Sequence, residues 1–83
     1  MNNKKREYIW RIKLNEILLT KGLTQTELAK RTGLRQATIS EMVNNTRSII
    51  NKNHLAIIMD ALDIIDMNEI LELHVVEREE RPL

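Results

Sequence analysis

Four side chains in the middle of the chain have the chemistry to read the edges of DNA base pairs. The amide of Gln36 can pair through two hydrogen bonds with N6 and N7 of adenine, and the methyl group of Ala37 can touch a thymine methyl. Ser40 can bond to any base, and Glu41 can accept a hydrogen bond from N4 of cytosine. Two alternatives stay open: Gln36 can belong to a plain solvated helix face, and Glu41 can face solvent or repel phosphates.

The spacing around these side chains predicts two short helices joined by a tight turn. The segment Thr24-Gln25-Thr26-Glu27 is a capping box, so a helix begins there and ends near Thr32, because Gly33 follows. The next helix is predicted over residues 36–44. A turn of about three residues cannot lay two helices antiparallel, so the helices must cross at a steep angle.

Such a crossing has packing requirements that the sequence meets. Ala29 supplies a small side chain where the helices touch, and Gly33 supplies a residue at ease with positive φ in the turn. Ile39 and Met42 supply apolar anchors on the second helix. These needs together predict a helix-turn-helix.

The stretch from Gly22 to Ser40 resembles the phage repressor and Cro family of helix-turn-helix regulators, of the xenobiotic-response-element type. The likeness rests on the capping box with Gln25, Ala29, Gly33 and Ile39, and it covers about residues 12–73. The sequence departs from the family in three places. Arg35 stands where Ser or Thr usually caps the third helix, Asn45 stands where Gly is common, and the link at residues 63–65 is one residue longer than usual.

The resemblance implies which residues meet DNA. The start of the third helix would enter the major groove and bring the four side chains named first to the bases. Contacts to the phosphate backbone would come from Gln25, with the amides at the start of its helix, and from Arg35, Thr38, Asn44, Thr46 and Arg47. The alternatives are ordinary helix capping for Gln25 and Asn44 and loop solvation for Arg47.

The periodicity of the rest of the chain predicts an all-α, lambda-repressor-like orthogonal bundle of five short helices. The first helix is expected over about Tyr8–Lys21, the fourth from Asn51 through Leu62, and the fifth from a capping box at Asp66 to about Val76. A basic arm at residues 1–7 and a charged, frayed tail at residues 77–83 complete a single domain of 83 residues. Such an arm can lie on DNA or be merely solvated.

Composition favours a cytoplasmic nucleic-acid-binding protein over an enzyme. Residues 1–52 carry eleven Lys and Arg against four Asp and Glu, whereas residues 53–83 carry two against eight. There is no cysteine, and His54 and His74 have no carboxylate at ligand spacing, so neither a metal nor another cofactor is expected. No apolar run approaches the roughly 20 residues that span a bilayer. No nucleophile has a base at catalytic spacing.

A single recognition helix reads only a few base pairs, so a homodimer on a palindromic operator is expected. It can form in solution or only on DNA. Leu73 and Val76 are candidates for its contacts, on an apolar patch of the fifth helix. The alternative for these two residues is packing against Trp10 or the first helix.

The sequence therefore predicts a small transcriptional regulator, in the first place a repressor. The competing class is a protein-interaction module or an antitoxin-type protein that acts through a protein partner.

Overall fold

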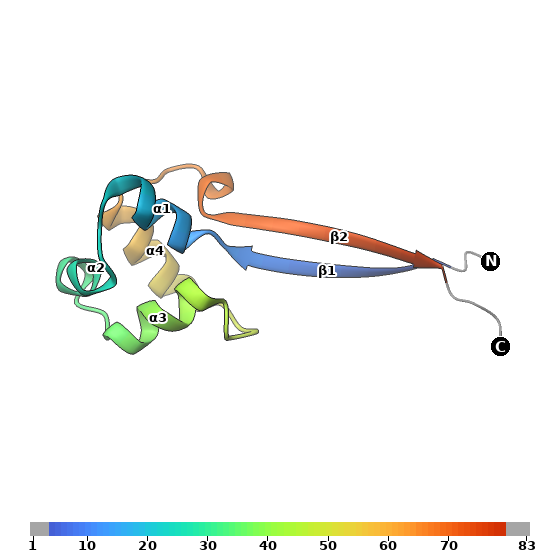
Figure 1. Cartoon of the computed structure of the whole chain (residues 1–83), viewed down its shortest axis with the longest axis horizontal. Coiled ribbons are helices and arrows are strands. Elements are labelled where there is room, and N and C mark those ends of the chain that lie inside the picture. The colour runs from blue at the N-terminus through green and yellow to red at the C-terminus, as the bar shows by residue number, and fades with distance from the viewer. Residues whose placement is uncertain (1–3, 80–83) are drawn as a thin grey trace.

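A helical head and a projecting two-stranded β-ribbon make up the protein (Figure 1). The computed structural model describes residues 4–79. The head contains α1 (Leu14–Lys21), α2 (Gln25–Thr32), α3 (Gln36–Asn44), α4 (Lys52–Ala61) and the 3₁₀ turn η1 (Met67–Glu69). The ribbon consists of β1 (Lys4–Ile12) and β2 (Leu71–Glu79). In the described part of the chain, no helix has the length and apolarity that crossing a membrane requires.

The ribbon joins the two ends of the described chain as an antiparallel pair. Lys4 lies opposite Glu79 at the tip, and Ile12 lies opposite Leu71 at the base. The ribbon leaves the head to one side, so the molecule measures 54 Å along its longest axis but only 24 and 22 Å across (Figure 1).

This architecture shows that the expected all-α bundle of five helices is wrong. The predicted first helix begins only at Leu14, and residues 8–12 belong to β1. The predicted fifth helix is absent: Asp66 caps a single 3₁₀ turn by accepting a hydrogen bond from the N–H of Asn68, and β2 follows. Apolar side chains recur at every second residue in 8–12 and 71–75, which suits a strand with one apolar face.

The basic arm expected at residues 1–7 and the frayed tail expected at residues 77–83 belong in part to the ribbon. Residues 4–7 and 77–79 are strand residues of the ribbon. The rest of the expected arm, residues 1–3, and of the expected frayed tail, residues 80–83, lies outside the described residues.

The predicted capping box and the predicted ends of the first three helices are confirmed. Thr24 and Glu27 form the capping box, in which the Thr24 hydroxyl accepts from the Glu27 N–H at 3.1 Å and the Glu27 carboxylate accepts from the Thr24 N–H at 3.2 Å. The residues after the helices, Gly22, Gly33 and Asn45, have φ of 66°, 74° and 53°. Each therefore ends its helix in the left-handed conformation.

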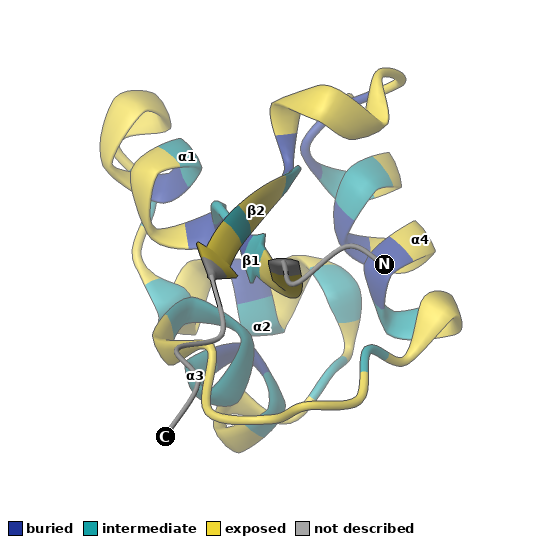
Figure 2. Ribbon diagram, turned by 90° about the vertical axis from the view of Figure 1, so that its right-hand side faces the viewer, coloured by how far each residue is buried: buried dark blue, intermediate teal, exposed yellow. Residues whose placement is uncertain are grey.

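The core lies inside the head and takes side chains from all four helices and from the base of the ribbon. Figure 2, which looks along the ribbon, shows the buried segments on the inner sides of the helices. Its members are apolar and at most 9% exposed: Ile12, Leu14, Leu18, Leu28, Ile39, Leu55, Ile58, Leu62, Ile64 and Ile70. Ile12 thus anchors β1 in the same core that positions the helices.

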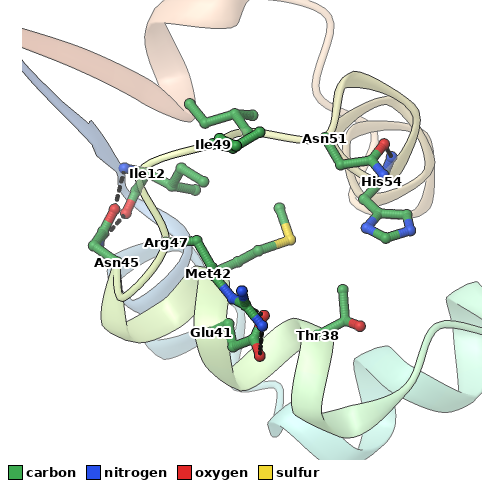
Figure 3. Close-up of a pocket in the computed structure, with 10 residues that line it drawn as sticks. Ile12, Thr38, Glu41, Met42, Asn45, Arg47, Ile49, Asn51 and His54 are labelled. Atoms are coloured by element: carbon green, nitrogen blue, oxygen red, sulfur yellow. Dashed lines mark hydrogen bonds and ion pairs between the residues drawn. The ribbon is translucent and has the colours of Figure 1, made fainter.

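Asn45 fastens the ribbon to the end of α3 (Figure 3). Its Oδ1 accepts a hydrogen bond from the Ile12 N–H at 2.7 Å, and its Nδ2 donates to the Ile12 carbonyl at 3.1 Å. A glycine would adopt the same left-handed backbone but could make neither bond. The departure from the family's common glycine therefore has a structural reason.

Asn45→Gly is expected to lower the free energy of unfolding by about 1–3 kcal/mol, because two partly buried backbone groups lose their partners. Urea unfolding followed by far-UV circular dichroism measures the loss. Asn45→Asp keeps the acceptor for the Ile12 N–H and loses only the donor, so it should fall between wild type and Asn45→Gly. An Asn45→Gly protein as stable as wild type would contradict the fastening role.

Candidate nucleic-acid interface

The turn between α2 and α3 is built as its spacing predicts. The Gly33 N–H donates to the Ala29 carbonyl at 2.9 Å, which ends α2 one residue before the turn. A side chain at Gly33 would meet nothing within 4 Å, so the positive φ, rather than space, favours glycine there. Ala29 and Met42 are partly buried against the core, and Ile39 is completely buried.

Thr32 also holds this turn, a role that the sequence interpretation missed. Its hydroxyl donates to the Leu28 carbonyl at 2.8 Å and accepts from the Leu34 N–H at 3.2 Å. One side chain thus closes the last turn of α2 and directs the chain into α3. The signal was a threonine directly before the turn glycine, since Thr hydroxyls commonly bond to backbone groups nearby.

The predicted base-reading side chains lie along one accessible side of α3. Gln36 and Ala37 are exposed, and Ser40 and Glu41 are half-buried. Gln36 is the first residue of the helix, and its side chain forms no hydrogen bond within residues 4–79. In Figure 1, α3 lies along the lower edge of the head, with α1, α2 and α4 above it. The opposite side of α3 carries Ile39 into the core, so the exposed side is held in a fixed direction.

Glu41 and Arg47 form an ion pair across the end of α3 (Figure 3). The guanidinium Nε and Nη2 donate to the two carboxylate oxygens at 3.1 and 3.2 Å. The hydrogen bonds and charge of Glu41 raise the pKa of Arg47 above its ordinary value. Glu41 and Arg47 were each predicted to contact DNA, and in the free protein they bind each other.

The other predicted phosphate-contacting residues flank α3 on both sides. Arg35 is exposed at the N-cap of α3, and no side chain in the described part of the chain caps that first turn. Asn44 donates to Ser40 Oγ at 3.4 Å, and the Thr46 N–H bonds to the Glu41 carbonyl at 3.1 Å. Gln25 is half-buried at the start of α2. Polar and basic groups thus border the exposed side of α3 at both ends.

A groove of about 320 Å³ lies behind the C-terminal half of α3, between α3, the loop after it and the start of α4 (Figure 3). Its lining includes the apolar residues Met42 and Ile50 and the polar residues Thr38, Arg47 and His54. The loop residue Ile49, which also lines the groove, is 84% exposed. Side chains of α3, of the loop after it and of the start of α4 therefore meet around this groove.

The predicted dimer residues are not brought together. No C-terminal helix carries Leu73 and Val76; both lie in β2, where Leu73 faces Trp10 and Val76 faces Glu7 across the ribbon. Since alternate residues of a strand point to opposite sides, these two side chains lie on opposite faces of the ribbon. A patch made of both is therefore excluded.

Comparison with known families identifies the domain to which the head of this chain is similar. The family model of the Cro/C1-type helix-turn-helix DNA-binding domain matches residues 13–74, which span the whole head and the start of β2. Comparisons with curated proteins and with solved structures give no match.

Proposed function

Because the chain belongs to the Cro/C1-type helix-turn-helix DNA-binding domain family, we propose that it is a small transcriptional repressor that binds a specific double-stranded DNA sequence through α3. The observation that carries this proposal is the exposed start of α3. Gln36 and Ala37 are exposed there, and Ile39 on the opposite side of the helix is buried in the core. A protein bound at an operator in the cytoplasm would exclude polymerase from the promoter.

The exposed side of α3 supplies the base contacts in this proposal. The Gln36 side chain, which has no partner among the described residues, is available for a bidentate pair with adenine, and Ala37 for a thymine methyl. Ser40, one turn further along α3, would bond to a base edge or through a water. Glu41 either accepts from a cytosine or holds Arg47, as it does in the free protein.

Backbone contacts would surround these bases. The start of α2 at Gln25 offers helix-terminal amides to one phosphate, where the helix dipole favours an anion. Arg35 and Thr38 on α3, and Asn44, Thr46 and Arg47 at its far end, would contact the flanking phosphates. These residues would fix the register of α3 in the groove.

The charge distribution of the head supports the same orientation. From Lys21 to Lys52, which includes α2 and α3, six Lys and Arg stand against two Asp and Glu. The acidic residues Asp60, Asp63, Asp66 and Glu69 follow along the end of α4 and η1. Figure 1 shows η1 at the upper edge of the head and α3 at the lower edge. The more basic side is therefore the side that would face the phosphates.

Salt-dependent binding tests the proposal. Affinity for random duplex should fall steeply with rising salt, because phosphate contacts release counterions, and selection from a random duplex pool should return a defined site. An absence of retention on duplex at low salt would instead favour action through a protein partner, which is the competing function. A selected palindrome would support two copies acting together.

Glu41→Gln is expected to strengthen binding to random duplex by about three- to tenfold, because it removes a carboxylate near phosphates and releases Arg47. Titrations at one salt concentration measure the change. The double variant Glu41→Gln/Arg47→Ala is the control and should lose most of the gain. Unchanged binding to random duplex would contradict this account, and weaker binding to the selected site alone would assign Glu41 to a base.

A further inference from the structure

The ribbon has one apolar face that nothing in the described chain covers. The antiparallel register places Trp10 opposite Leu73 and Tyr8 opposite Val75 on the same face. These side chains are 57%, 42%, 58% and 48% exposed, respectively. We call these four residues the ribbon patch. Tyr8 and Trp10 are the only aromatic residues in the sequence. The patch continues into the core through Ile12, which lies on the same face at the base.

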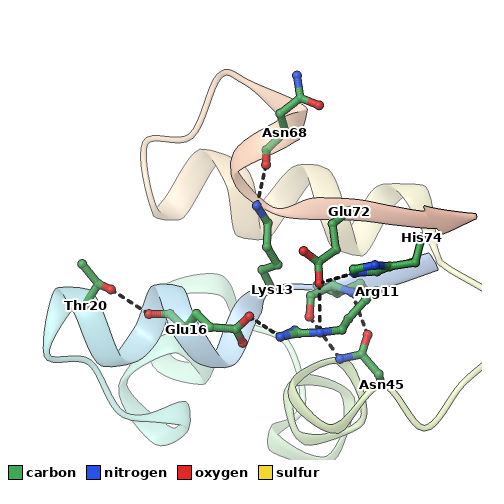
Figure 4. A network of polar contacts seen from close by, with 9 residues as sticks. Arg11, Lys13, Glu16, Thr20, Asn45, Asn68, Glu72 and His74 are labelled. Carbon is green, nitrogen blue, oxygen red and sulfur yellow. Dashed lines mark hydrogen bonds and ion pairs between the residues drawn. The ribbon is translucent and has the colours of Figure 1, made fainter. Parts of the chain in front are cut away.

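The opposite face of the ribbon is mainly charged and is satisfied by its own ion pairs. Arg78 pairs with Glu7 at 3.3 Å, and Arg11 pairs with Glu72 at 3.1 Å. His74 lies 3.2 Å from the same Glu72, and its hydrogen bond and the charge of Arg11 lower the pKa of that carboxyl (Figure 4). Ile9 and Val76 are the apolar residues on this face. The two faces therefore differ in chemistry, as those of a strand pair with one packed face do.

A ribbon of this kind needs a second layer. An isolated two-stranded ribbon is marginally stable in water, and stability normally comes from further strands or from packing against another element. The ribbon patch exposes roughly 400 Å² of mostly apolar surface, which is in the range of the largest patches on monomers, often functional ones. The ion pair of Arg6 with Glu77 at 3.1 Å borders it toward the tip. An apolar centre with a polar rim is the anatomy of a protein interface.

We propose that the ribbon patch packs face to face against the ribbon patch of a second copy of this chain. A two-fold axis that crosses the strands in the middle of the patch would bring Tyr8 of each copy against Trp10 of the other, and the aliphatic residues of the two β2 strands against each other. Two copies would bury roughly 800–1,000 Å² in total, the size of a small interface. Pairing along the strand edges would instead leave both patches uncovered.

The shape of the molecule determines how the two copies are arranged. Packed sheets lie about 10 Å apart, whereas the molecule is 24 by 22 Å across. Two heads at the same end of stacked ribbons would therefore collide, so the heads must lie at opposite ends. The proposal rests on the proposed function in one respect: such a dimer presents two α3 helices to two half-sites, as a palindromic operator requires.

The oligomeric state of the full chain without DNA tests the proposal. Sedimentation equilibrium from about 1 to about 500 µM covers the range expected for an interface of this size. Trp10 is the only tryptophan, so its fluorescence reports directly on the patch. We expect a reversible monomer–dimer equilibrium, with Trp10 emission moving to shorter wavelength as the dimer forms. A chain that stays monomeric over this range, with unchanged emission, overturns the proposal.

A matched pair of variants identifies the face. Leu73→Thr/Val75→Thr changes the patch and keeps the tryptophan, whereas Ile9→Thr/Val76→Thr makes similar changes on the opposite face. Threonine favours strands, and Ile12 is untouched in both. The patch variant should weaken dimerisation about tenfold or more, and the opposite-face variant less than about twofold. Equal weakening by both overturns the face-to-face arrangement. Should Leu73→Thr/Val75→Thr unfold the ribbon, Val75→Thr against Val76→Thr repeats the comparison with smaller changes.

The outcome is separable from that of the proposed function. A dimer with the expected variant pattern that binds no duplex would support the interface and refute DNA binding. A monomer that binds duplex with steep salt dependence would do the opposite.

Discussion

Gln36→Ala is expected to weaken binding to the preferred duplex by about 1–3 kcal/mol while leaving binding to random duplex nearly unchanged. Gln36 is exposed at the first position of α3, and its side chain has no partner within residues 4–79, so its amide is available to a base edge. Its loss removes a bidentate contact and leaves the packing of the head intact. Competition between the selected and a random duplex at one salt concentration measures both effects.

Gln25→Ala is the matched control for this prediction. The same side chain is removed, but from the start of α2, where a phosphate contact is proposed. Phosphate contacts carry no direct sequence information, so Gln25→Ala should weaken binding to both duplexes by a similar factor. If Gln36→Ala behaves in the same way as Gln25→Ala, Gln36 does not read bases.

Ile39→Ala is expected to lower the free energy of unfolding by about 2–5 kcal/mol. Ile39 is completely buried and anchors α3 against the core that also holds Leu28 of α2. For a small domain this is a large fraction of the total stability, which is about 5–15 kcal/mol in typical proteins. DNA binding should therefore weaken with the folded fraction, even though Ile39 faces away from the duplex.

Urea unfolding of Ile39→Ala and Ile65→Ala separates burial from the loss of side-chain volume. Ile65 loses the same atoms, but it is 95% exposed in the loop before η1, so its change should stay within about 0.5 kcal/mol. Similar losses for both variants would show that Ile39 does not brace α3.

The helix-turn-helix could be predicted from the sequence because its determinants are local. The capping box at Thr24, the positive φ of Gly33 and the buried position of Ile39 each follow from a few neighbouring residues. The ion pair between Glu41 and Arg47 was not predicted, since it depends on the path of the loop after α3. The same holds for the bonds from Asn45 to Ile12, which join residues 33 positions apart.

The ribbon could not be predicted in the same way, because each strand forms only with the other. Ile9 stands between Tyr8 and Trp10 and obscures the alternation of β1, and Val75 and Val76 are adjacent in β2. The acidic and leucine-rich start of β2 also suits a helix. The cap at Asp66 serves a single 3₁₀ turn as well as the start of a longer helix. Local patterns therefore favoured helices at both ends of the head.

The connection of the two strands through the entire head has a consequence for how the chain reaches its native state. Arg6 and Glu77 pair across 71 positions of sequence, and even Lys13 and Asn68 at the base are 55 apart. Closing so long a loop costs entropy that the short-range helical contacts avoid. We therefore expect the helices to pack together first and the strands to pair afterwards, starting from Ile12 and Leu71 at the base. On a ribosome, the ribbon would then be the last part to form.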